Sequence, residues 1–248
     1  MGTATRINAE AGAAWRSFVR RRTAVFFTFF FPVILIVIFG ALVRTDPTGT
    51  GLFTEPAGYY VPGYLAVVVL FTPLSRVGST VARHREGNRF EKLATTPLSR
   101  AEWLAAHTLV NVGIIGVASV LLLALILLIT DAQFGFSLWL VPLLVFGVTL
   151  FCGIGAALGR IADSQDGVIA ASNSIALPML FLAETFVTPD LLPEYVLPLV
   201  DLLPLTYFSR GVRAATYYGR SPAVDLAILA ALAIASFAVG AYAIPQTD

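Results

Sequence analysis

Few side chains in this sequence are of the types that carry out chemistry. The chain has one cysteine, Cys152, two histidines, His84 and His107, and one lysine, Lys92, against fifteen arginines. Cys152 lies in an apolar run without a second cysteine, so no intramolecular disulfide can form. Neither histidine has a histidine or carboxylate partner at the spacing of a metal site. The sequence therefore predicts no catalytic residue, no metal and no cofactor on this chain.

The motifs of this chain also exclude a P-loop ATPase site. A P-loop reads G-x-x-x-x-G-K-[ST], because glycines let the backbone approach the phosphates and the lysine neutralises them. The only lysine, Lys92, is not preceded by glycine. Any function driven by ATP would need another polypeptide.

One pattern of carboxylates points weakly to a membrane enzyme. Asp163-x-x-Asp166-Gly167-x-x-Ala170 resembles the opening of the metal-binding signature of CDP-alcohol phosphatidyltransferases. Ala171 stands where that signature has arginine, and no later glycine with paired aspartates follows. The acids also suit the positive end of a helix dipole. Such an enzyme remains a remote alternative.

The composition around these residues is strongly apolar. Of 248 residues, 57% are hydrophobic and 12% are charged, and the mean hydropathy is +0.82. An average soluble domain carries roughly twice that charged fraction. This excludes a soluble enzyme, a disordered chain and a nucleic-acid binder. It predicts an all-α integral membrane protein with a single transmembrane domain over residues 1–248.

Several apolar segments approach the roughly 20 residues that a helix needs to cross the hydrocarbon core. These expected spans are 23–43, 59–81, 104–130, 136–158, 168–187 and 224–244. Helices are the expected form because lipid cannot satisfy open backbone groups. Basic residues gather before the first span and between the second and third. The positive-inside bias therefore places both termini and the loop at 83–100 in the cytoplasm.

Residues 5–20 carry an amphipathic pattern. One helical face would hold Ile7, Ala11, Ala14, Trp15 and Phe18, with most arginines elsewhere. This predicts a helix lying in the headgroup plane, where arginines meet anionic lipid. The alternative is a frayed cytoplasmic N-terminus with accidental periodicity.

The charged segment 83–99 predicts a short helix followed by a sharp turn. One face of that helix would carry Arg85, Arg89 and Lys92, and a small apolar patch would carry Phe90, Leu93 and Ala94. Thr96-Pro97 ends the helix, because the residue before a proline is disfavoured in the helical region. A capping box, Ser99-x-x-Glu102, then starts the third span. The alternative is a charged connector that only satisfies the positive-inside bias.

Residues 188–207 are too apolar for a solvated loop and too rich in proline for another crossing. They predict a re-entrant hairpin at the outer end, with a simple interfacial loop as the alternative.

Three polar residues lie within or near the spans. Arg76 is expected to snorkel toward headgroups rather than to contact another helix. Asn173 is expected to hold helices together, and Glu184 to reach headgroups.

Two segments carry a family resemblance. The first is Arg85-Glu86-Gly87-x-x-x-Glu91-x-Leu93-x-x-Thr96-Pro97-Leu98-Ser99. The second runs from Asn173 through Pro178-Met179-x-Phe181-Leu182 and Pro204-Leu205-Thr206-Tyr207 to Arg213. In this order they resemble the coupling segment and the outer hairpin of ABC-2 type permeases. These are membrane subunits of ATP-binding-cassette exporters and include permeases of the daunorubicin-resistance type. Asn88 and Leu203 depart from the residues common in that family.

The resemblance implies an assembly in a prokaryotic cell membrane. Two permease chains, identical or related, would associate with a dimer of ATPase subunits that bind ATP and Mg²⁺. The cargo would be an unidentified drug, lipid or glycan-like molecule. The ATPase-coupling residues would be Arg85, Glu86, Gly87, Arg89, Phe90, Glu91, Leu93, Thr96 and Pro97. Residues of the outer hairpin or pathway would be Asn173, Pro178, Pro204 and Tyr207.

A self-sufficient channel or ion-coupled secondary transporter is the alternative function. Such a protein would need paired membrane charges facing a pathway, or broken helices related by a repeat. Apart from Arg76 and residues at the edges, the expected spans lack such charges.

Overall fold

The structure, a computed structural model, describes residues 2–38, 55–130, 132–188 and 192–245. These residues are helical apart from turns and loops, and they contain no strand. Within these ranges lie two short 3₁₀ turns, η2 (Ala57–Tyr60) and η4 (Glu194–Val196). The helices are α1 (Thr3–Val19), α2 (Arg22–Ile36), α3 (Val61–Glu86), α4 (Arg89–Ala94), α5 (Arg100–Ile129), α6 (Leu140–Ile161), α7 (Gln165–Leu182), α8 (Leu197–Leu202), α9 (Pro204–Thr216) and α10 (Ala223–Ala243).

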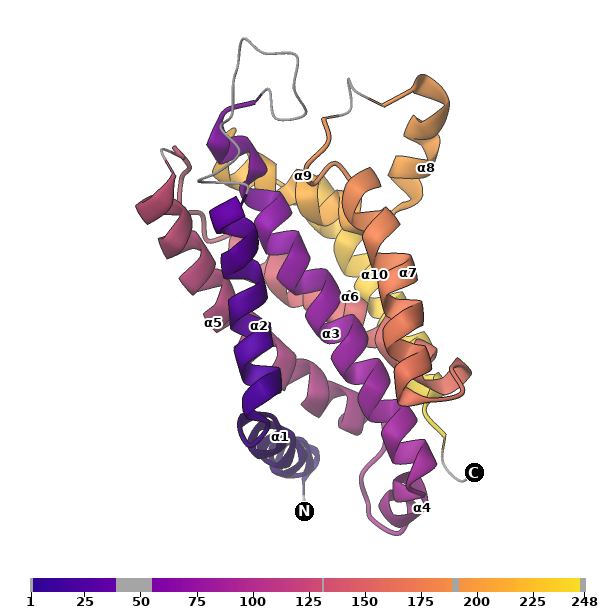
Figure 1. Cartoon of the computed structure of the whole chain (residues 1–248). Helices are drawn as coiled ribbons and strands as arrows, with labels where there is room; N and C mark the ends of the chain where they lie inside the picture. The colour runs from indigo at the N-terminus through magenta and orange to yellow at the C-terminus, as the bar shows by residue number, and fades with distance from the viewer. Residues whose placement is uncertain (1, 39–54, 131, 189–191, 246–248) are drawn as a thin grey trace.

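Helix α3 is the central element of the bundle. It packs against α5, α6, α7 and α9, and the residues of its first ten positions are all buried. Figure 1 shows α3 running obliquely between α2 on one side and α7 on the other. This first part of α3 is apolar on every side, as expected for a buried helix segment.

Glycines allow α6 to approach α3 unusually closely. A Cβ added at Gly155 would lie 2.5 Å from the carbonyl oxygen of Leu74, and one at Gly159 would lie 2.4 Å from that of Gly78. On another face of α6, a Cβ at Gly153 would lie 2.3 Å from the carbonyl oxygen of Ser236 in α10. Small residues at such contacts let helices associate in lipid, where no hydrophobic force drives them together.

The two ends of the bundle differ in structure (Figure 1). At one end lie α1, α4 and the last turn of α10. The guanidinium of Arg100 donates to the carbonyl oxygen of Tyr242 at 3.0 Å and so joins the start of α5 to the end of α10. At the other end lie η2, α8 and the start of α9. The coupling segment and the outer hairpin expected from the sequence are therefore at opposite ends.

Four helices of the described residues are long and apolar enough to cross a membrane. They are α3 with its preceding η2 turn, α5, α6 and α10, which match the expected spans at 59–81, 104–130, 136–158 and 224–244. The expected first span coincides with α2 only in part, because residues 39–43 lie outside the described residues. The expected span at 168–187 was too long: α7 ends at Leu182, where the chain turns.

The N-terminal segment forms the expected helix, α1. Its predicted apolar face does not simply face lipid, since Ala14 and Phe18 are buried against Val110 and Ile114 of α5. Trp15 is 45% exposed and remains available for an interface. Helix α1 is thus attached to the protein by part of the face that the sequence assigned to the membrane.

Candidate functional site

Helix α4 is a short, separate helix that follows α3 after a tight turn. Asn88 begins it with a left-handed backbone, at φ 50°. Asparagine adopts this conformation more readily than most residues because its short side chain can bond locally. The turn reverses the chain, so that α4 lies beside the end of α3 (Figure 1).

Two side chains fix the end of α3 to the connection between α6 and α7. Arg85 donates to the carbonyl oxygens of Gly159 (3.4 Å), Arg160 and Ala162. These carbonyls at a helix C-terminus lack helical partners and favour a cation. The carboxylate of Glu86 accepts from the backbone N–H of Gln165 at 3.1 Å, at the start of α7. Helices α3, α6 and α7 are thereby joined at one point.

The apolar side chains of α4 attach it to the bundle. Phe90 is 3% exposed, and its ring centroid lies 5.4 Å from that of His84 and 5.6 Å from that of Trp103. Leu93 is half-buried against the same core. The apolar patch expected from the sequence therefore faces inward in large part. Ala94, the third residue of that patch, is exposed, and so are Glu86, Gly87, Asn88, Arg89, Glu91, Lys92, Thr95, Thr96 and Pro97.

The expected capping box at the start of α5 is present. Ser99 Oγ accepts from the N–H of Glu102 at 3.2 Å, and the Glu102 carboxylate accepts from the N–H of Ser99 at 2.8 Å. Arg6 of α1 also binds this carboxylate, with Nε 3.2 Å from each oxygen. This hydrogen bond raises the pKa of Arg6. One carboxylate therefore joins α1 to the segment that follows α4.

A second polar contact holds α1 against α5. Glu10 Oε1 lies 3.4 Å from His107 Nε2, and hydrogen bonding to His107 lowers the pKa of Glu10. The ring of Trp103 lies between the two histidines, with centroids 4.0 Å from His107 and 5.6 Å from His84. Both histidines thus belong to the packing at this end of the bundle.

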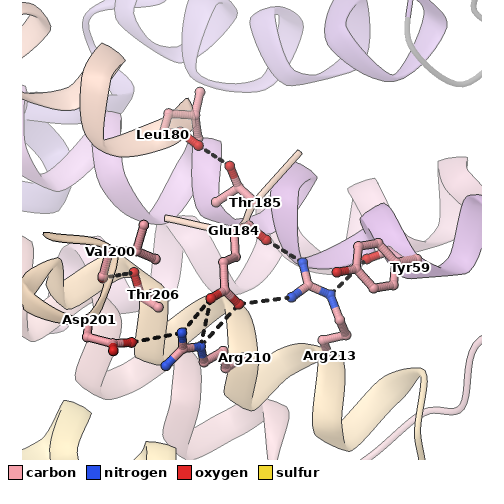
Figure 2. Close-up of polar contacts among 9 residues, drawn as sticks. All are labelled: Tyr59, Leu180, Glu184, Thr185, Val200, Asp201, Thr206, Arg210 and Arg213. Atoms are coloured by element: carbon pink, nitrogen blue, oxygen red, sulfur yellow. Dashed lines mark hydrogen bonds and ion pairs between the residues drawn. The ribbon is translucent and has the colours of Figure 1, made fainter. Parts of the chain in front are cut away.

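At the opposite end, Glu184 is the centre of a polar network (Figure 2). It follows α7 with a left-handed backbone at φ 54° and is 4% exposed. Arg210 of α9 binds its carboxylate, with Nε 3.1 Å from each oxygen, and also lies 2.9 Å from Asp201 of α8. Hydrogen bonding to Glu184 raises the pKa of Arg210. The expectation that Glu184 reaches headgroups was wrong.

Arg213 extends this network to Tyr59 in the η2 turn before α3 (Figure 2). Its guanidinium donates to the backbone carbonyl of Glu184 and lies 3.8 Å from the Glu184 carboxylate. It also donates to the carbonyl of Tyr59 at 3.4 Å and lies over the Tyr59 ring, 4.0 Å from its centroid. Buried charges are stable only when paired in this way. The network fastens the α7 turn, α8, α9 and the η2 turn together.

The four residues expected in the outer hairpin or pathway lie on two helices, Asn173 and Pro178 on α7 and Pro204 and Tyr207 on α9. Pro204 is the first residue of α9, and the hydroxyl of Tyr207 donates to the carbonyl of Asp201 at 2.7 Å. Pro178 is exposed within α7. Asn173 is also exposed, and it lines a cavity that continues toward α1. It does not hold helices together among the described residues.

The cavity has a volume of about 790 Å³ and lies among α1, α2, α3, α4 and α7. Arg76 is in its wall. The Arg76 guanidinium donates to Asn111 of α5 at 3.2 Å and lies over the ring of Phe18, 4.4 Å from its centroid. The expectation that Arg76 only snorkels was therefore wrong, because this side chain joins three helices.

The sequence analysis did not predict the polar network around Glu184 or the contacts of Arg85 with the carbonyl oxygens at the end of α6. A signal existed for the first: Arg210 and Arg213 are spaced to share one face of a helix in an apolar region, where charges need partners. Nothing in the sequence indicated that Arg85 reaches the end of α6, since 75 residues separate it from Arg160.

The apolar helices define a multi-pass membrane protein, and the anchored α4 segment lies at one end of it. The profile of the family described as ABC-2 type transporter matches residues 7–217, and the chain belongs to this family. This confirms the resemblance found in the sequence. The family consists of membrane subunits of transporters.

The chain is also similar in sequence to an individual protein of known name. Over 160 residues the chain is 28% identical to "Daunorubicin resistance ABC transporter permease protein DrrB1" of Streptomyces coeruleorubidus. The alignment covers 62% of this chain and 56% of the relative, so the match spans little more than half of that protein.

Proposed function

We propose that the chain is the permease subunit of an ATP-binding-cassette exporter. Two such chains, identical or related, form the pathway, and a dimer of separate ATPase subunits binds ATP and Mg²⁺. Membership of the ABC-2 type transporter family and the likeness to a drug-resistance permease support this function. This chain itself would have no catalytic role.

In this proposal six helices cross the membrane: α2, α3, α5, α6, α7 and α10. The end that carries α1 and α4 faces the cytoplasm, because the basic residues concentrate there. Helix α1 lies along the cytoplasmic interface. The segment after α7, with α8 and the start of α9, dips into the outer leaflet and returns.

The observation that carries the proposal is the way α4 is attached. Glu91, Thr96 and Pro97 are exposed and do not line the cavity, so they are available to a partner, while the residues on either side of α4 are fixed to other helices. Arg85 and Glu86 join it to α6 and α7, and Glu102 joins it to α1 and α5. A displacement of α4 by an ATPase would therefore be transmitted to the whole bundle.

The outer network would close the opposite end. Glu184, after α7, and Asp201 of α8 both pair with Arg210 of α9, which holds these segments together at that end. Cargo leaving the pathway would have to pass this hairpin or move along the lipid face beside it. Asn173, Pro178, Pro204 and Tyr207 would line successive parts of this route rather than one site.

The test is assembly with the candidate ATPase. Glu91 is exposed on α4, so Glu91→Arg should leave the fold intact but weaken complex formation and permease-stimulated ATP hydrolysis. Leu93→Asp is a stronger variant, but it also disturbs packing because Leu93 is half-buried. Complex formation is measured by co-purification from membranes, and hydrolysis by phosphate release.

The matched control is Glu194→Arg, which reverses an exposed acid at the opposite end of the bundle. It should assemble as the unaltered protein does. Equal assembly and equal hydrolysis for Glu91→Arg would contradict the coupling role. Transport by the chain alone in vesicles would favour a channel or ion-coupled carrier instead.

A further inference from the structure

The cavity beside α3 has an unbalanced charge. Its wall carries five permanent cations from three segments of the chain: Arg21 before α2, Arg76 and Arg83 of α3, and Arg89 and Lys92 of α4. Glu10 is the one carboxylate among the described lining residues, and it lies 3.4 Å from His107. Within the described residues, none of the five cations forms an ion pair with a carboxylate.

The positive-inside bias alone does not explain this arrangement. That bias favours basic residues in water beside the headgroups, where each is solvated separately. Here Arg76 lies in the middle of α3 and is held in position by Asn111 and Phe18. Neither contact neutralises its charge. Several cations that surround one cavity focus a positive potential inside it.

The same cavity also has an apolar wall and small polar groups. Phe27 and Ala24 of α2 and Phe71 of α3 line it, together with the hydroxyls of Ser75 and Ser79. Its volume of about 790 Å³ lies within the range of sites for small ligands, roughly 300–1,000 Å³. A ligand matching this wall has a compact anionic group and an apolar chain.

We infer that this cavity binds a phosphate-bearing amphiphile as the cargo of the transporter. The guanidinium groups of Arg76 and Arg83 hold the phosphate, because guanidinium donors match phosphate oxygens in geometry and charge. The apolar chain lies against Phe27 and Phe71. A cationic amphiphile of the same size is repelled. The inference rests on the proposed function, since it names the class of molecule that the permease exports.

The binding test uses the full chain in an uncharged detergent and three probes. These are dodecyl phosphate, dodecyltrimethylammonium and inorganic phosphate, with affinity measured by thermophoresis. Dodecyl phosphate should bind at least about tenfold more tightly than dodecyltrimethylammonium, a difference typical of one charge-assisted hydrogen bond. It should also bind at least about tenfold more tightly than inorganic phosphate, which has no apolar chain to bury. Equal binding of the cationic probe would overturn the inference. Equal binding of inorganic phosphate would show a site for free phosphate and would overturn it too.

Substitutions of residues in the cavity wall test whether dodecyl phosphate binds in this cavity. Arg76→Gln should weaken dodecyl phosphate binding by about tenfold or more. Because Arg76 also joins helices, a second variant avoids any effect on folding. Arg21→Gln removes an exposed cation of the wall and should weaken binding about two- to fivefold. Its control is Arg20→Gln, an exposed neighbour that does not line the cavity and should bind as before. Equal affinities of the Arg21 and Arg20 variants would contradict the assignment.

The failure of this inference can be separated from failure of the proposed function. Assembly with the ATPase is measured on the same samples, and the Arg21→Gln variant should assemble normally. Normal assembly without selective binding of dodecyl phosphate would leave the permease role intact and overturn the cargo. Selective binding without assembly would support the site and contradict the exporter.

Discussion

Arg6 in α1 and Glu102 in α5 form an ion pair although 96 residues separate them in the sequence. The same carboxylate completes the capping box with Ser99. The start of α5 is therefore fixed from two directions.

Removing the cap should destabilise the protein measurably. Ser99→Ala deletes the oxygen that accepts from the N–H of Glu102, and the loss of such a cap costs about 1 kcal/mol. The measurement is thermal unfolding in detergent, read by circular dichroism. Ser221→Ala is the control, because Ser221 is exposed before α10 and its side chain does not cap that helix. Equal unfolding temperatures of the two variants would speak against the cap.

The two carboxylates that bind Arg210 should differ greatly in importance. Glu184→Ala leaves the buried charge of Arg213 without its carboxylate, which costs about 3–5 kcal/mol. Asp201→Ala removes the partner whose side chain is 58% exposed and should cost at most about 1 kcal/mol. Denaturant unfolding of both variants compares them directly. A similar loss for both would show that the network is not held by Glu184.

Replacing glycine by alanine should change the stability of the protein in opposite directions at two positions. Gly155→Ala places a Cβ 2.5 Å from the carbonyl oxygen of Leu74, so that α6 and α3 must separate, at about 1–3 kcal/mol. Gly113→Ala in α5 meets no atom within 4 Å and should stabilise the helix by up to about 1 kcal/mol. Thermal unfolding of the two variants checks the sign. A gain of stability at Gly155 would contradict the close contact.

Acid should weaken the contact between α1 and α5. Hydrogen bonding to His107 lowers the pKa of Glu10 below its ordinary value of 4.5. Its stabilising contribution is therefore fully present above that value and is lost as the pH falls through the lower pKa of the folded protein. The stability difference between the unaltered protein and Glu10→Gln should shrink in that range. It is measured as unfolding temperature against pH, and a constant difference would refute the contact.

Local signals in the sequence predicted local structure well. The amphipathic pattern at 5–20 predicted α1, and Ser99-x-x-Glu102 predicted the start of α5, because both depend on residues within a few turns of one another. Apolar length predicted the four long helices. The prediction of α7 was less accurate, since the turn after Leu182 depends on Glu184 and its distant partners in α9.

Contacts between distant segments could not be predicted in the same way. Phe90 and Leu93 have the composition of a docking patch, yet only the position of Trp103 decides that they face inward. The five cations of the cavity are spread over residues 21–92, and no spacing rule brings them together. The family resemblance named the coupling segment, but it did not indicate which of its residues are exposed.

The glycine contacts of α6 determine which parts of the bundle can shift independently. Backbone touches backbone between α6 and both α3 and α10, so these three helices can hardly slide past one another. Any opening of a route across the protein must then rotate this trio as a rigid body. The hinges of that rotation would lie in α2 and α7, which pack beside α3.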